Sequence, residues 1–200
     1  MQMYTIEEME DQVAVAMTAG DWSRVDALGA ELDRLAQPVE VALSAAALWY
    51  AEQGLAVFPL QPGTKVPFAG SRGCKDATTD PERIRRWWSS APEANIGLAT
   101  GRVVDVVDID GPAGQASRCV HWEQLADLEV VGRVCTPRPG GMHLYVPAAG
   151  VGNKAGLLPG IDYRGRGGYV VAPPSRTEQG TYWWMEPLRV PVTAVLGGAA

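Results

Sequence analysis

Two aspartates near the middle of the chain have the types and spacing of a metal site. Asp108 and Asp110 close the apolar run 103–110. Because side chains of a β-strand alternate between its faces, both carboxylates point to one face and Asp105 points to the other. Carboxylates roughly 7 Å apart on one face can share a pair of Mg²⁺ or Mn²⁺ ions, since both ions prefer oxygen ligands. Taken alone, the pair is better explained as a solvated strand end before the turn at Gly111-Pro112.

Two later segments add groups that handle phosphate. The glycine pair 140–141 lets backbone amides come close to an anion, and His143, at the following strand start, can donate to a phosphate oxygen. Farther along, Asp162 adds a third acid just before another strand, and Arg164 and Arg166 suit phosphate binding. A single histidine is more often a packed or surface residue. The three segments therefore indicate chemistry only when they are taken together.

The elements that must position these segments are predicted from periodicity and turn residues. Asp80, Pro81 and Glu82 supply a cap, a first-turn proline and an acid, so a helix is expected to begin at Pro81. Further helices are expected over 40–53 and 112–128. Strands are expected over 55–60, 95–100, 103–110, 130–136, 142–146, 168–172 and 181–185. This order indicates an α+β fold whose later sheet is mainly antiparallel.

Residues 1–38 are predicted to form an acidic helical arm. A capping box at Thr5 and a cap at Asp21 predict two helices, and the second has an apolar stripe at Val25, Leu28, Leu32 and Leu35. Residues 1–40 hold nine acids against two arginines, a net charge of −7, whereas the other 160 residues sum to +1. We therefore expect the body to bind a nucleic-acid backbone weakly and with strong salt dependence.

At the three chemical segments the sequence resembles the primase/polymerase (prim-pol) branch of the archaeo-eukaryotic primase superfamily. The motifs stand in the family's order: the acidic pair, a Gly-Gly-x-His segment ending at His143, and Asp162 ahead of Gly-Gly-Tyr-Val-Val-Ala-Pro-Pro-Ser at 167–175. Upstream landmarks lie at 63–67, 76–80, 87–88 and 95–97, so the likeness covers about 47–184. One departure is Arg138-Pro139, where many relatives have a small hydroxyl residue, and this leaves the phosphate contacts there open.

The resemblance implies a primase/polymerase catalytic fold over 39–190, with an RRM-like, mainly antiparallel sheet and packed helices, followed by a tail or linker at 191–200. The implied activity is DNA primase or DNA polymerase, that is, template-directed nucleotidyl transfer with two Mg²⁺ or Mn²⁺ ions. By family role, Asp108, Asp110 and Asp162 hold the metals. His143 takes the family's nucleotide-phosphate role, so the three aspartates and His143 are the expected catalytic residues. Arg164 and Lys65 are expected to hold the triphosphate together with His143.

The partners implied are a single-stranded DNA template with a primer, and nucleoside triphosphates of the deoxy or ribo series. The composition, with 14 arginines against three lysines, suggests a bacterial, plasmid or phage replication system, and a replicative helicase in the same or another chain is an open expectation. Arg83, Arg85 and Arg86 with Trp87 and Trp88 either contact the template or form an amphipathic helix with its tryptophans packed inward.

Cofactor and compartment expectations follow from the cysteines and the hydropathy. Cys74, Cys119 and Cys135 are interpreted as free, buried thiols, and structural zinc is not expected because the cysteines and histidines do not cluster. No apolar run approaches the roughly 20 residues that span a bilayer, and the acidic start is unlike a signal peptide. A cytoplasmic protein without membrane contact is therefore expected.

Two other functions remain open at this point. The run Val106-Val107-Asp108-Ile109-Asp110-Gly111 also looks like the nucleophile motif of haloacid dehalogenase-type phosphatases, although that fold needs a parallel sheet and a later lysine, and no lysine follows Lys154. The second alternative is a non-catalytic nucleotide-binding or replication-origin-binding module.

Overall fold

The computed structural model describes residues 42–189 continuously, together with Gln12, Val15, Ala16, Thr18, Ala19, Asp21, Ser23, Arg24, Ala27 and Leu28. The chain divides into two compact units, Met1–Val41 and Ala42–Ala200, each of which is described by itself. In the described part, no helix is long and apolar enough to span a bilayer.

In the N-terminal unit, the described positions of 12–19 and 23–28 are helical. The backbone amide of Arg24 donates to Oδ1 of Asp21 at 3.1 Å, which confirms Asp21 as a helix cap. The Arg24 guanidinium also donates to the side-chain oxygen of Gln12 at 3.1 Å. The rest of the expected arm, including Val25, Leu32 and Leu35, and the expected tail at 191–200 lie outside the described residues.

The larger sheet of the second unit carries the chemical segments. It has six strands in the order β11-β4-β5-β3-β7-β6, and every neighbouring pair is antiparallel. In chain order the strands are β3 (Val104–Ile109), β4 (Gly132–Cys135), β5 (Met142–Pro147), β6 (Lys154–Leu158), β7 (Ile161–Arg164) and β11 (Trp183–Glu186). Strand β3, which contains Asp108 and ends just before Asp110, is therefore flanked on both sides by strands from much later in the chain.

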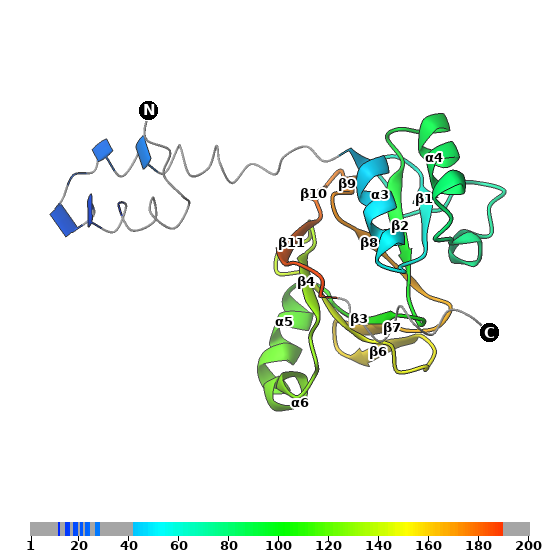
Figure 1. Cartoon of the computed structure of the whole chain (residues 1–200). Coiled ribbons are helices and arrows are strands. Elements are labelled where there is room, and N and C mark those ends of the chain that lie inside the picture. Colours follow the sequence, from blue (N-terminus) through cyan, green and yellow to red (C-terminus); the bar gives the residue numbers. More distant parts are fainter. Residues whose placement is uncertain are drawn as a thin grey trace. The chain divides into compact units, whose positions relative to one another are not determined.

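A smaller sheet faces the first. Its antiparallel order is β1-β2-β8, formed by β1 (Val57–Leu60), β2 (Asn95–Ala99) and β8 (Tyr169–Ala172). Helices α3 (Leu43–Glu52) and α4 (Pro81–Ser90) lie against it, as the upper part of the body in Figure 1 shows. A short 3₁₀ turn, η1 (Gly73–Asp76), and the ribbon of β9 (Arg176–Thr177) and β10 (Gly180–Thr181) complete this half.

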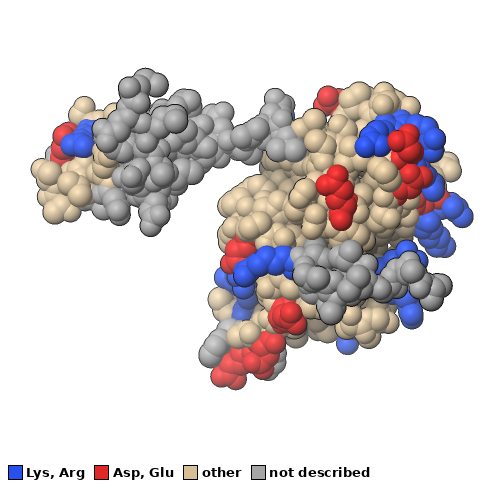
Figure 2. Space-filling model, in the orientation of Figure 1, with Lys and Arg blue, Asp and Glu red and all other residues tan. Residues whose placement is uncertain are grey.

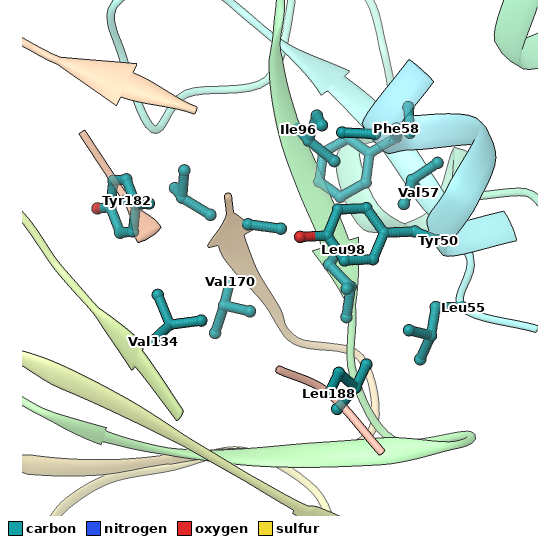
Figure 3. Packing of buried hydrophobic residues seen from close by; sticks show 14 of the residues in the cluster. Tyr50, Leu55, Val57, Phe58, Ile96, Leu98, Val134, Val170, Tyr182 and Leu188 are labelled. Atoms are coloured by element: carbon teal, nitrogen blue, oxygen red, sulfur yellow. The ribbon is translucent and has the colours of Figure 1, made fainter. Parts of the chain in front are cut away.

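The main hydrophobic core fills the space between the two sheets, and Figure 3 shows its side chains. Val104 and Val106 of β3 and Tyr145 of β5 enter it from the large sheet, where they meet Ile96 and Leu98 of β2. On the opposite face of the large sheet, a second cluster packs beside α5 (Gly111–Val120) and α6 (Trp122–Ala126). It consists of Val107, Ile109, Leu144 and Ile161, with Leu125 and Leu128 against them.

Most expected elements are present, with informative differences. Helix α4 begins at Pro81, and Asp80 accepts from the amides of Glu82 and Arg83, as its cap motif predicts. The expected helix 112–128 is broken at His121 into α5 and α6. Strands β6 and β7 were not expected, and Asp162 lies within β7 rather than before a strand.

The cysteine interpretation needs correction. All three thiols are free, as expected, but none is fully buried, because Cys74 and Cys135 are partly accessible and Cys119 is exposed at the end of α5. Their partial exposure follows from their positions in a short turn, an edge-proximal strand and the outer face of a helix.

Candidate active site

Three predicted site residues form a row across the large sheet. In the antiparallel register, Asp108 of β3 is directly opposite His143 of β5 on one side and Asp162 of β7 on the other. The distance from Nε2 of His143 to Oδ1 of Asp108 is 3.6 Å. Since residues in cross-strand register share one face of the sheet, the pairing of β3 with both neighbours gathers these side chains.

Arg164 links two of the predicted metal ligands. Its Nη2 lies 3.3 Å from Oδ2 of Asp108 and 2.8 Å from Oδ2 of Asp162. The second oxygen of Asp162 accepts from the backbone amide of Gly156 at 2.7 Å. Burial raises the pKa of Asp108, although the guanidinium of Arg164 acts in the opposite direction. The Arg164 guanidinium therefore partly offsets the cost of burying the Asp108 charge.

Asp110 lies beyond the end of β3 and has a different partner. It is the N-terminal flanking residue of α5 but makes no side-chain capping bond there. Instead, Oδ1 of Asp110 lies 3.1 Å from Nη1 of Arg138. Arg138 belongs to the tight β4-β5 turn, in which the amide of Gly141 donates to the Arg138 carbonyl at 2.8 Å. The residue that departs from the family pattern thus pairs with an acid of the site.

A cavity of about 310 Å³ opens between the two sheets at this row, a size within the range of small-molecule sites. Asp108, Asp110, His143, Arg164 and Lys65 all line it, so both members of the acidic pair face the same space. Asp162 is not among the lining residues. The remaining lining residues are Cys74, Thr136, Asn153, Gly167, Gly168, Tyr169, Val170, Val171 and Tyr182.

Sequence reasoning assigned no role to Tyr182, which lines the cavity. Its ring centroid lies 5.7 Å from that of the His143 ring and 5.9 Å from the Lys65 ammonium. It follows β10, and its amide donates to the Ser175 carbonyl at 2.9 Å. No local motif marks this tyrosine, because its proximity to His143 arises from the return of the chain after β8.

His143 is neutral in the folded chain. Its side chain is 6% exposed, and burial, together with the charge of Lys65, lowers its pKa to about 3. Its Nδ1 has no hydrogen-bond partner within the described residues. A neutral imidazole carries one N–H, so His143 can act on an anion as a hydrogen-bond donor but not as a cation at neutral pH.

The three aspartates have the right chemistry for a divalent cation, but their carboxylates do not converge on one point. Carboxylate oxygens are the ligands that Mg²⁺ and Mn²⁺ prefer, and Asp108 is a buried carboxylate that a cation would stabilise. Within the part of the chain that the structure describes, however, no three acidic, histidine or cysteine side chains converge as around an ion. The assignment of Asp108, Asp110 and Asp162 as ligands stays a prediction.

Two of the three arginines of helix α4, Arg83 and Arg85, lie close to acidic side chains. Arg72 and Arg83 both approach Asp76, at 2.6 Å and 3.9 Å, and Arg85 pairs with Glu82 at 2.8 Å. Figure 2 shows these opposite charges interspersed at the upper right, where Figure 1 places α4. The guanidinium of Arg83 also stacks over the Trp87 ring at 4.7 Å.

Trp88 of α4 is packed inward rather than available to a template strand. Only 2% of it is exposed, and its indole N–H donates to the Ala94 carbonyl at 2.9 Å inside the core. It is therefore packed inward and does not stack on a nucleic-acid base. A template contact by the arginines stays a prediction.

Comparison with known proteins identifies one matching family. A family model described as bifunctional DNA primase/polymerase, N-terminal, matches residues 47–194, which is most of the chain and includes every predicted site residue. No curated protein matches the chain.

Proposed function

The chain belongs to the bifunctional DNA primase/polymerase family, and from this premise we propose that it is a template-directed nucleotidyltransferase that uses two divalent metal ions. The observation that carries the proposal is the row of His143, Asp108 and Asp162 in register, beside a cavity that His143, Asp108 and Asp110 line. In the proposed reaction, a hydroxyl oxygen attacks the α-phosphorus of a nucleoside triphosphate, the bond to the β-phosphate oxygen breaks, and pyrophosphate leaves.

Asp108, Asp110 and Asp162 would hold Mg²⁺ or Mn²⁺. When bound, such ions lower the pKa of an attacking hydroxyl and neutralise charge on the leaving oxygen. Asp108 and Asp162 are already linked through Arg164, so movement of that one guanidinium frees an oxygen of each. Ligand geometry of this kind can tighten when substrate binds, because catalytic contacts in a free enzyme are often long.

The side chains proposed to bind the nucleotide are two cations, Arg164 and Lys65, and the neutral N–H donor His143. Arg164 presents a guanidinium that matches phosphate geometry, and Lys65 presents an ammonium at the cavity. His143 would add a directional hydrogen bond from a neutral ring to a phosphate oxygen. Together these groups orient the triphosphate, since alignment and charge stabilisation are what phosphoryl-type transfer requires from a protein.

The phosphatase alternative loses its support. Within residues 42–189, β3 is an interior strand of a sheet in which every pairing between named strands is antiparallel, whereas that phosphatase fold places its motif on a parallel sheet. A non-catalytic nucleotide-binding or origin-binding module remains as the second candidate, because the same cavity could bind a nucleotide without transferring it.

One experiment separates these functions. The protein is incubated with a primed and an unprimed single-stranded DNA template, labelled deoxy- or ribonucleotides, and Mg²⁺ or Mn²⁺. Elongation of the primer supports polymerase activity, and labelled product on the unprimed template supports primase activity. Nucleotide binding without incorporation on either template, under both metals, would identify a binding module and refute the proposal.

A further inference from the structure

The position of Lys65 is set by side chains outside its own loop. Lys65 lies in the segment 61–67 after β1 and lines the cavity. A backbone hydrogen bond closes this loop, because the backbone N–H of Gln61 donates to the Val66 carbonyl at 2.8 Å. Within the described residues, the Lys65 ammonium has no carboxylate partner and contacts Tyr182, whose ring centroid lies 5.9 Å away.

Tyr169 of β8 holds the backbone of Lys65 itself. Its hydroxyl donates to the Lys65 carbonyl at 3.0 Å, across 104 residues of chain. The ring is fixed by an edge-on contact with Phe58, with centroids 5.2 Å apart. Burial raises the pKa of Tyr169, so the hydroxyl keeps its proton and remains a donor at neutral pH.

Asn95 of β2 holds the residue before Lys65. Its side chain is almost fully buried, and its amide nitrogen donates to the Thr64 carbonyl at 2.8 Å and to the Arg176 carbonyl at 2.6 Å. Its oxygen accepts from the Arg176 amide at 3.0 Å. Two consecutive carbonyls, at 64 and 65, are therefore tied to two different strands of the small sheet.

We propose that Tyr169 and Asn95 are positioning residues that hold Lys65 where its ammonium binds the β- and γ-phosphates of a nucleoside triphosphate. The inference deepens the proposed function and rests on it. If the α-phosphate lies at the carboxylates, the remaining phosphates need a cation from elsewhere on the cavity wall. The two anchored carbonyls fix the backbone from which the Lys65 side chain extends, so only side-chain freedom remains to be lost when the ammonium binds a phosphate.

The test compares Tyr169→Phe with a matched control. Tyr169→Phe removes one hydroxyl and keeps the ring against Phe58, while Tyr50→Phe removes a hydroxyl that donates to another backbone carbonyl, that of Pro173 at 2.8 Å. Calorimetric titration of the full chain with dATP and with dAMP, in Mg²⁺, measures both affinities. Tyr169→Phe weakens dATP binding by about three- to tenfold and leaves dAMP binding unchanged, and Tyr50→Phe changes neither.

A double-mutant cycle distinguishes positioning from general structural damage. Lys65→Met weakens dATP binding by about tenfold, and adding Tyr169→Phe to it weakens binding by less than about twofold further, because the hydroxyl acts through Lys65. Asn95→Asp removes the side-chain N–H groups that donate to the Thr64 and Arg176 carbonyls. If this variant folds, its loss of dATP affinity is at least as large as that of Tyr169→Phe.

The outcomes distinguish failure of this inference from failure of the proposed function. Equal effects of Tyr169→Phe on dATP and dAMP, or full additivity with Lys65→Met, would overturn the positioning role alone. No change in dATP affinity for Lys65→Met would remove Lys65 from the nucleotide site and overturn this inference with it. Absence of dATP binding by the unaltered chain would instead count against the proposed function.

Discussion

Asp108 and His143 stand directly opposite each other on β3 and β5, with 3.6 Å between Oδ1 of the aspartate and Nε2 of the imidazole. A predicted metal ligand and a predicted nucleotide-binding group are thus neighbours in one register of one sheet. Substitution of either residue changes the surroundings of the other, so their effects on transfer are expected to be non-additive.

The acidic pair should be essential for nucleotide incorporation. We expect Asp108→Ala or Asp110→Ala to reduce incorporation by at least about 100-fold, because loss of a metal ligand removes several kcal/mol of charge stabilisation in the transition state. Circular dichroism should show a retained fold. Asp127→Ala, at an exposed acid after α6, is the control and should incorporate normally. Near-normal activity of either site variant would refute the metal assignment.

His143 should act on the nucleotide more than on the template. We expect His143→Ala to weaken dATP binding by about tenfold and to slow transfer, because it removes a hydrogen bond to a charged group. Affinity for single-stranded DNA, measured by fluorescence anisotropy, should stay unchanged. An unchanged dATP affinity, or an equal loss for the two ligands, would argue against this role.

The buried imidazole should also make stability depend on pH. The pKa of His143 is lowered from 6.5 to about 3 by burial, so below pH 6.5 the unfolded chain takes up a proton that the folded chain does not. The free energy of unfolding therefore falls as the pH decreases from about 6.5 towards 3. His143→Gln should lose less stability across this window than the unaltered chain, as followed by urea unfolding.

The control for that measurement is His121→Gln, which alters the only other histidine, at the end of α5. Its unfolding free energy should follow that of the unaltered chain at each pH. Identical pH profiles for His143→Gln and the unaltered chain would mean that the imidazole is accessible to protons in the fold.

On the opposite face of β3, a hydrogen bond from Tyr163 to Asp105 should stabilise the pairing of β3 with β7. Tyr163 donates to Oδ2 of the fully buried Asp105 at 2.6 Å, and the other Asp105 oxygen has no partner in the described residues. Tyr163→Phe should cost about 1.5–3 kcal/mol and lower the melting temperature by about 3–10 °C. Tyr145→Phe, whose buried hydroxyl lacks a partner within the described residues, should leave the melting temperature unchanged or raise it. An equal effect of the two variants would contradict this account.

The acidic arm should be dispensable for chemistry. All predicted site residues lie in 65–164, and the family match begins at residue 47. Deletion of residues 1–37 should preserve primer extension, and template affinity should stay unchanged or rise slightly at low salt, because a charge of −7 on residues 1–40 repels phosphate. A truncated protein that is folded but cannot extend a primer would place the arm in the active site.

The sequence by itself determined the local features of the site. Alternation along 103–110 placed Asp108 on the face opposite Asp105, and the Asp80-Pro81 cap located the start of α4, because both rules depend only on residues a few positions apart. The three motifs, in family order, identified the family. Strands β6 and β7 were missed, because β6 is mostly exposed and lacks an alternating apolar pattern, while β7 follows a glycine turn.

Only the tertiary structure decided which distant residues meet. The flanking of β3 by β5 and β7, and hence the opposition of Asp108 to both His143 and Asp162, depends on strand pairing across tens of residues. The same holds for Tyr182 beside His143 and for Tyr169 on the Lys65 carbonyl. Such pairings arise because the fold must bury both faces of the large sheet at once, and that constraint acts on the whole chain rather than on any short segment.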